Sequence, residues 1–281
     1  MLGNRNMKII FLTLFCCLSF SLMASAQASG GQIVRTRHKA VGPSRTESRP
    51  IQTEKFEVNG IPFTMVKVDG GTFTMGMSLN RAKQTINEDA TPAHKVTLSS
   101  YYIGITEVTN ELWNAVMNPN ANNDDKRPKE ASWVECSKFV AQLNEITGKK
   151  FRLPSEAEWE FAARGGKRSH GYKYSGGNNL DAVAWHYENS GGQLHPVGMK
   201  KPNELGIYDM NGNADEWVQD WYGKYDSSPQ IDPKGPSIGE TRVVRGGNQN
   251  CGSGTILVES RTSRVPNWDM HPAGFRLCLS E

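Results

Sequence analysis

The sequence predicts a single α+β domain with little regular secondary structure, and three observations lead to this class. Short apolar runs broken by Gly, Asn and Ser predict strands joined by tight turns before residue 106. Three segments between residues 109 and 166 carry the capping and stop signals of helices. Beyond Gly166 the chain is rich in Gly, Asn, Asp and Trp and has weak periodicity. We expect buried Trp side chains to hold this irregular part together.

The predicted strands form three successive hairpins, and order is expected to begin near Phe56. The hairpins span residues 56–63 with a turn at Asn59-Gly60, residues 63–75 with a turn at Asp69-Gly70-Gly71, and residues 96–105 around Ser99-Ser100.

Three helices follow, each with a polar cap and a stop. The first runs from Thr109 to Met117, the second from Ser132 to Gly148 with Phe139, Val140, Leu143 and Ile146 on one face, and the third from the capping box Ser155–Glu158 to Gly165-Gly166.

The N-terminus has the pattern of a secretory signal peptide. Lys8 precedes an apolar run that continues to Met23, and the small residues 24–26 form a cleavage site. An uncleaved membrane anchor is the alternative, but the apolar run is short for a membrane span. We therefore predict a signal peptide over residues 1–26 and export to the periplasm, the outer surface or the medium, with no transmembrane span after cleavage.

The formal net charge of +3 is concentrated near the N-terminus. Residues 1–26 contribute +2 and residues 27–54 contribute +3, which leaves about −2 for residues 55–281. Residues 27–54 lack apolar periodicity and are predicted to be a flexible basic linker. A mildly acidic body at residues 55–281 argues against binding nucleic acid.

Cleavage after residue 26 leaves Cys136, Cys251 and Cys278. Three is an odd number, so at most one disulfide forms, and the sequence leaves its pairing open. Cys251 lies in a polar Gly-rich loop and is the only credible nucleophile or soft-metal ligand. It is otherwise half of a disulfide or an idle thiol. No two His residues have the spacing of a helical zinc site.

Residues 206–217 gather oxygen donors around one flexible Gly. Ca²⁺ takes six to eight oxygens from carboxylates, amides and backbone carbonyls. The side chains of Asn211 and Glu216 and the carbonyls of Gly212 and Ala214 are candidates, although the spacing is not that of an EF-hand. A turn that caps a short helix is the alternative for this segment.

Five segments in order and spacing resemble the formylglycine-generating enzyme, or sulfatase-modifying factor, family. The resemblance covers the chain from about Phe56 to Cys278 and implies one domain with a C-type-lectin-like core. The segments are residues 63–76 (FTMVKVDGGTFTMG), residues 107–110 (EVTN), residues 152–160 (RLPSEAEWE), residues 206–217 with Trp221, and residues 245–247 (RGG) with residues 274–276 (GFR).

The resemblance also implies two metals. One is a structural Ca²⁺ held by Asn211, Gly212, Ala214 and Glu216. The other is the copper with which these enzymes and O₂ oxidise a sulfatase Cys to formylglycine, held by two cysteines five residues apart. Cys251 matches the first of these, but Ile256 stands at the second, and Cu(I) prefers paired thiolates. Cys278 restores the pair only if the fold brings it beside Cys251.

Two functions follow from the resemblance. The first is a non-catalytic exported module that binds a protein or peptide ligand or assembles at a surface, as some members of the family do. Its ligand face would be residues 248–271, with Asn248, Arg264 and Trp268 as contact residues, although these side chains are as readily explained as packing of an irregular core. The alternative is an active formylglycine-generating oxidase.

Overall fold

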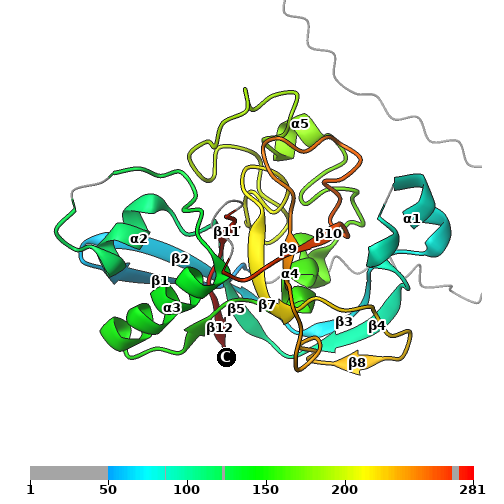
Figure 1. Ribbon diagram of the computed structural model, residues 1–281, viewed down its shortest axis with the longest axis horizontal. Helices are drawn as coiled ribbons and strands as arrows, with labels where there is room; N and C mark the ends of the chain where they lie inside the picture. Colours follow the sequence, from blue (N-terminus) through cyan, green and yellow to red (C-terminus); the bar gives the residue numbers. More distant parts are fainter. Residues whose placement is uncertain (1–49, 86, 122–123, 268–271) are drawn as a thin grey trace, which may run out of the picture. The chain divides into compact units, whose positions relative to one another are not determined.

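The computed structural model describes residues 50–85, 87–121, 124–267 and 272–281 (Figure 1). Its strands are β1 (Thr53–Val58), β2 (Ile61–Val68), β3 (Gly71–Met75), β4 (His94–Leu98), β5 (Tyr101–Gly104), β6 (Phe151–Arg152), β7 (Glu216–Trp221), β8 (Gln230–Ile231), β9 (Arg242–Arg245), β10 (Arg261–Arg264), β11 (Gly274–Phe275) and β12 (Cys278–Ser280). Its α-helices are α1 (Leu79–Thr85), α2 (Asn110–Met117), α3 (Trp133–Thr147), α4 (Glu156–Ala163) and α5 (Leu180–Val183), and two short 3₁₀ helices cover Glu88–Ala90 and Gly166–Arg168.

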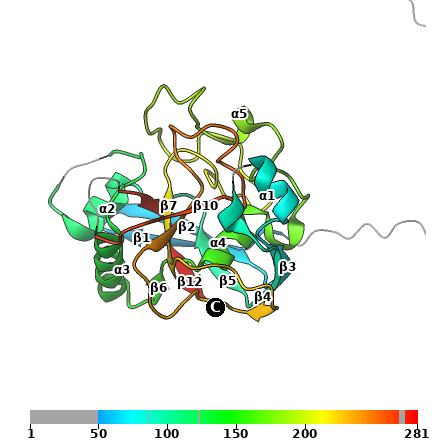
Figure 2. The same ribbon diagram turned by 45° about the vertical axis from the view of Figure 1, so that its right-hand side comes forward.

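The strands form three sheets. One has the order β1-β2-β5-β12-β6, the second β10-β9-β7-β11 and the third β3-β4-β8. In Figure 1, α2 and α3 lie beside β1 and β2, whereas α4 lies beside β7 and β9. The loop between β9 and β10 lies near α5 in both views (Figures 1 and 2). The α+β prediction is confirmed, whereas the C-type-lectin-like core stays a prediction.

The first predicted hairpin is confirmed. β1 and β2 pair in antiparallel register, and the turn residues Asn59 and Gly60 adopt positive φ angles of 49° and 81°. β1 nevertheless begins at Thr53, so the strand extends into the range predicted as linker, residues 27–54. The reason is tertiary, because Thr53 pairs with Val66 of the longer strand β2.

The other two hairpins are wrong as pairings, although their strands exist. β2 pairs with β5 and β3 pairs with β4, so each predicted turn is a corner at which the chain passes from one sheet to another. The two corners pack against each other. A Cβ at Gly70 would lie 2.4 Å from the carbonyl oxygen of Leu98 and 2.7 Å from the backbone nitrogen of Ser100, so no larger residue fits there.

All three predicted helices are confirmed, because their caps are local. Thr109 accepts from the backbone N–H of Leu112, and Ser132 and Ser155 each form a capping box. Gly148 ends α3 in the left-handed conformation. One predicted core residue is wrong: Ile146 is 45% exposed, because it lies in the last turn of α3 beyond the apolar cluster that covers Phe139 and Leu143.

Buried side chains form three hydrophobic clusters. The first surrounds Trp159 at the meeting of α4 with the sheets, the second surrounds Phe139 under α2 and α3, and the third lies between α5 and the β9–β10 loop. Every residue of α4 is buried, including Glu156, Glu158 and Glu160. Among the helices of the described residues, none combines the length and apolar character that crossing a membrane requires.

Candidate functional site

A cavity of about 430 Å³ opens beside Cys251, between the β9–β10 loop and the end of β10. We call it the Cys251 cavity. It brings together three of the residues that the sequence singled out, Asn248, Cys251 and Arg264, whereas the fourth, Trp268, lies outside the described residues. Other lining residues are Asn87, Asp89, Asp215, Gly247, Ser260 and Arg261.

The carboxylate of Asp215 organises the polar wall of this cavity. Its Oδ2 accepts a hydrogen bond from Nδ2 of Asn248 and an ion-paired bond from Nη2 of Arg264. Asp215 is 4% exposed, whereas the side chain of Arg264 keeps 18% of its surface in solvent. Asp215 therefore fixes the orientations of the guanidinium and the amide that line the cavity.

Among the described residues that line the cavity, Cys251 supplies the single sulfur. Its side chain is half-buried, and its Sγ lies 3.4 Å from the backbone nitrogen of Asn248, which donates to it. Burial raises the pKa of the Cys251 thiol, so the protonated form predominates at neutral pH. A protonated thiol is a weak nucleophile and a poor metal ligand.

Ile256 occupies the place beside this sulfur. A Cβ at Gly247 would lie 3.1 Å from Cγ1 of Ile256 and 3.6 Å from Cβ of Cys251, so both side chains flank the same glycine. Ile256 is fully buried in the third hydrophobic cluster, against which Cys251 packs. A branched hydrocarbon side chain thus stands next to Cys251 and offers no metal ligand.

The three cysteines belong to three different hydrophobic clusters. Cys136 packs in the second, Cys278 in the first, and Cys251 against the third. All three are free thiols. Sγ of Cys278 contacts Oε2 of Glu158 in the core at 3.7 Å and does not line the Cys251 cavity. The fold therefore does not restore the copper pair through Cys278, and the donor set of this cavity does not fit Cu(I).

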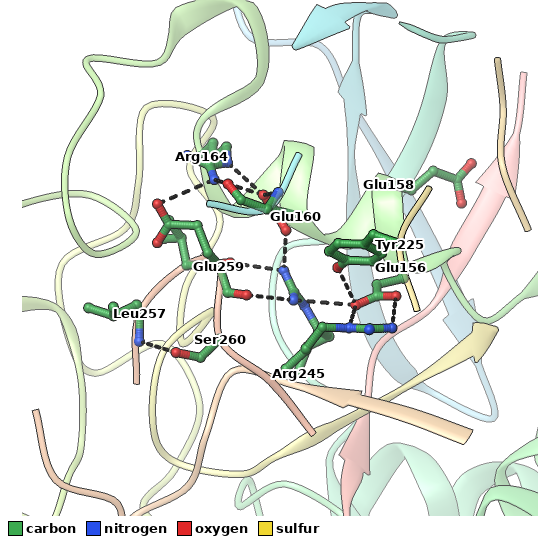
Figure 3. Close-up of polar contacts among 12 residues, drawn as sticks. Glu156, Glu158, Glu160, Arg164, Tyr225, Arg245, Leu257, Glu259 and Ser260 are labelled. Atoms are coloured by element: carbon green, nitrogen blue, oxygen red, sulfur yellow. Dashed lines mark hydrogen bonds and ion pairs between the residues drawn. The ribbon is translucent and has the colours of Figure 1, made fainter. Parts of the chain in front are cut away.

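Arg245, which lines the cavity, belongs to a network of buried charges whose contacts Figure 3 shows. We call it the Arg245 network, and it consists of Glu156, Glu160, Arg164, Arg245 and Glu259. Nη2 of Arg245 donates to Oε2 of Glu160 at 2.6 Å, and its two terminal nitrogens also donate to the carbonyls of Val258 and Glu259 at 3.0 Å. Neither side chain of the Arg245–Glu160 pair is exposed.

The negative and positive charges of the Arg245 network nearly balance each other. Burial by itself raises the pKa of Glu160, but the charges of Arg164 and Arg245 outweigh it and leave the pKa below its usual value. Arg261 closes the network toward solvent. It donates to both oxygens of Glu156 at 2.8 Å and lies between the rings of Tyr222 and Tyr225.

Sequence reasoning missed this network, although a signal was present. Three Glu residues alternate with apolar residues in α4, and Arg245 ends a strand of buried Val residues. Glu side chains are almost never fully buried unless they are paired, so three of them in one helix are ordinarily expected at the surface. Glu156 and Glu160 are buried here because β10 and β9 bring Arg261 and Arg245 to them from 105 and 85 residues away. Glu158 instead pairs with Arg152, six residues before it.

The side chains predicted to hold Ca²⁺ already have protein partners. Oδ1 of Asn211 accepts the backbone N–H of Ser175 at 2.6 Å. The carboxylate of Glu216 accepts two bonds from Arg276, at 2.5 and 2.7 Å, and one from Nε1 of Trp159 at 2.8 Å. Because Arg276 neutralises the single charge of the predicted set, these side chains do not fit a divalent cation as they lie.

Comparison with known proteins identifies the family. The sulfatase-modifying factor enzyme 1-like domain matches residues 52–280. The chain belongs to this family.

Relatives in the sulfatase-modifying factor family carry different names. The chain is similar to the chaperone protein LppX of Paenibacillus barcinonensis, with 34% identity over 212 residues that cover 56% of this chain and 71% of LppX. It is 27% identical over 282 residues to a formylglycine-generating enzyme of Streptomyces coelicolor, covering 75% of this chain and 87% of that enzyme. It is 30% identical over 236 residues to the serine/threonine-protein kinase Pkn1 of Chlamydia trachomatis, covering 71% of this chain but only 36% of the kinase.

Solved structures show the same fold. Treponema denticola variable protein 1 superposes with a TM-score of 0.72 at 30% identity, covering 82% of this chain and 99% of that protein. PvdO from Pseudomonas aeruginosa superposes with a TM-score of 0.70 at 24% identity, covering 83% of this chain and all of PvdO, and supports the fold alone.

Proposed function

We propose that this protein is an exported, non-catalytic member of the sulfatase-modifying factor family that binds a protein or peptide ligand or assembles at a surface. The observation that carries the proposal is Ile256, which lies beside Cys251 and leaves one sulfur among the described residues of the cavity. The N-terminal leader over residues 1–26 supports export.

The loss of one sulfur is decisive for copper because Cu(I) is a soft ion that prefers paired thiolates. A single thiol does not supply the second ligand, and because burial raises the pKa of Cys251, Cu(I) also has to displace its proton. Removing one of the two sulfur ligands of a copper site removes most of its affinity for Cu(I). The scaffold thus persists while its oxidative chemistry does not.

The walls of the Cys251 cavity supply the chemistry of a ligand face. Asp215 fixes Asn248 and Arg264 through hydrogen bonds, which lowers the entropy that these side chains lose when they contact a partner. Guanidinium and amide groups bond readily to peptide carbonyls and carboxylates. Trp268 stays a predicted contact residue.

One observation favours the alternative, a formylglycine-generating oxidase. Cys251 is half-buried rather than fully buried and faces an open cavity, so a peptide Cys has access to it. An oxidase of this kind needs copper and O₂, and it acts on a Cys-containing sulfatase segment.

Two measurements separate these functions. The purified protein is fully reduced, titrated with Cu(I), and then incubated with copper, O₂ and a Cys-containing sulfatase peptide, with the Cys251→Ser variant as control. We expect no tight one-to-one Cu(I) binding and no peptide aldehyde by mass spectrometry. Stoichiometric Cu(I) that depends on Cys251, or an aldehyde formed only by the unmodified protein, would contradict the proposal.

A further inference from the structure

A second cavity, of about 300 Å³, opens beside the first turn of α4. We call it the Asp220 cavity. Among the described lining residues, the Asp220 cavity and the Cys251 cavity have only Arg261 in common. Its apolar and aromatic walls are formed by Met75, Ala157, Trp221, Tyr225, Pro233 and Pro236.

The carboxyl group of Asp220 lies buried in this cavity with one oxygen unpartnered. Asp220, in β7, is 4% exposed. Its Oδ2 accepts the backbone N–H of Glu156 at 2.9 Å, whereas Oδ1 has no hydrogen-bond partner among the described residues. A Cβ at Gly235 would lie 3.2 Å from this Oδ1, so any larger residue there would crowd the carboxyl. The cavity therefore contains a hydrogen-bond acceptor that the protein itself does not use.

The cations near Asp220 are paired with other carboxylates. Arg261 donates to both oxygens of Glu156 at 2.8 Å, and Arg152 donates to both oxygens of Glu158 at 2.6 and 2.7 Å. Burial, followed by the charge of Glu156, raises the pKa of Asp220 to about 8. At pH 7 a proton thus neutralises this carboxyl, and a bound cation can take the place of that proton.

The remaining charged groups around the cavity leave Asp220 without an ion pair. Arg242 places its guanidinium 3.4 Å from the ring centre of Trp221 and donates to a main-chain carbonyl at 2.6 Å. Lys224, Asp226 and Lys234 also line the cavity but are exposed, and neither lysine forms an ion pair with a described residue. These lysines make an anion the rival occupant, whereas the unused acceptor of Asp220 is buried.

His94 supplies a second acceptor to the cavity. It is 4% exposed, and its ring centre lies 4.9 Å from that of Tyr225. Its Nδ1 lies 3.0 Å from the carbonyl oxygen of Pro92, which can only accept, so Nδ1 carries the hydrogen. In the neutral ring Nε2 then keeps its lone pair, and no described residue donates to it.

We propose that the Asp220 cavity binds a primary ammonium group at the end of an aliphatic chain, as found in a free alkylamine or in a Lys side chain of a partner protein. The ammonium group has a positive charge and N–H donors, which suit the Asp220 carboxylate and the lone pair of His94. The methylene chain gains free energy by packing against the apolar walls. This second binding site is independent of the function proposed for the Cys251 cavity.

Isothermal titration calorimetry with n-butylamine tests the site, in two buffers of different ionisation enthalpy. We expect one ligand per chain and release of about one proton per ligand at pH 7, because the ammonium ion replaces the proton of Asp220. For the same reason the affinity should rise by roughly 10-fold between pH 6.5 and pH 8, a range in which the amine stays charged. Butyrate, an anion of the same chain length, should bind far more weakly.

Variants assign the binding to Asp220. Asp220→Asn keeps the size of the side chain and should weaken n-butylamine binding by about 10-fold or more and abolish proton release. Gly235→Ala leaves the carboxyl in place but crowds Oδ1, so it should also weaken binding. Glu240→Gln is the control, since it removes an exposed carboxylate outside the cavity and should leave the affinity unchanged.

Three results would overturn the proposal: no binding of n-butylamine to the unmodified protein, equal affinity and proton release in Asp220→Asn, or tighter binding of butyrate than of n-butylamine. Titration with Nα-acetyl-lysine methylamide then distinguishes the two sources of the ammonium group. Binding about as tight as that of n-butylamine assigns the cavity to a Lys side chain of a partner, whereas binding of n-butylamine alone assigns it to a free amine.

Discussion

The Arg245 network and the Cys251 cavity share the β9–β10 region but differ in the groups that surround their reactive or charged side chains. In the network, the charges of Glu160 and Arg245 are paired, buried and fixed by carbonyls of the chain. In the cavity, one thiol faces open space beside a hydrocarbon side chain. The difference teaches that the buried charges of the network are held by groups from distant parts of the chain, whereas Cys251 has a hydrocarbon neighbour and an open side.

The largest expected effect comes from a substitution that breaks the Arg245 network. Arg245→Ala leaves Glu160 with an uncompensated part of its charge in the core, and we expect a loss of about 3–5 kcal/mol in the free energy of unfolding, measured by urea denaturation. Arg127→Ala is the control, because Arg127 pairs with Asp125 outside the network and its side chain is 55% exposed; it should leave the free energy of unfolding nearly unchanged. Equal losses would show that the network is no more important than a surface ion pair.

A second substitution adds a sulfur to the Cys251 cavity. Ile256→Cys places a second thiol beside Cys251, and we expect it to raise Cu(I) affinity by roughly 100-fold or more, as measured by competition with a Cu(I) chelator. Leu257→Cys, at the next position of the same buried cluster, is the control and should not do so. If Ile256→Cys binds copper no better than the unmodified protein, the placement of Ile256 beside the sulfur is not what excludes the metal.

Asp220, at the edge of the Arg245 network, predicts that the free energy of unfolding depends on pH. Burial, followed by the charge of Glu156, raises the pKa of Asp220 to about 8, while its Oδ2 accepts the backbone N–H of Glu156 at 2.9 Å. The folded protein thus holds a proton that unfolded Asp releases near pH 4, so this group's contribution is full below about pH 4 and is lost as pH rises toward 8.

Asp220→Asn mimics the protonated carboxyl and should remove this slope, which amounts to at most about 1.4 kcal/mol per pH unit in urea denaturation. Asp226→Asn, at an exposed position nearby, should keep the slope of the unmodified protein. If the unmodified protein and Asp220→Asn have identical slopes, the raised pKa of Asp220 does not cause the pH dependence of stability.

The smallest expected effect concerns accessibility rather than stability. In protein without residues 1–26, a thiol reagent should modify one cysteine in the folded state and three after denaturation, because Cys136 and Cys278 are fully buried. The folded-state reaction should be slow, since the pKa of Cys251 is raised, and Cys251→Ser should abolish it. Labelling of Cys278 in the folded protein would show that the core around Glu158 opens.

Short sequence signals correctly predicted the helix caps and the first hairpin turn, because interactions between residues close in sequence decide these features. Thr109, Ser132 and Ser155 cap their helices as expected, and the Asn59-Gly60 turn joins β1 to β2. The same approach failed for the second and third hairpins, because a turn signal at Gly70 fits a corner between sheets as well as it fits a hairpin.

The sequence by itself determined the family, the α+β class and three of the helices, and it predicted that Ile256 stands in place of a second copper ligand, because each depends on residue identity at a given position. Only the tertiary structure decided the pairing of β2 with β5, the burial of three glutamates of α4 and the separation of the cysteines. It also showed that Arg276 neutralises Glu216. The physical reason is that the protonation and ligand-binding capacity of a buried charge depend on which groups the fold brings against it from distant parts of the chain.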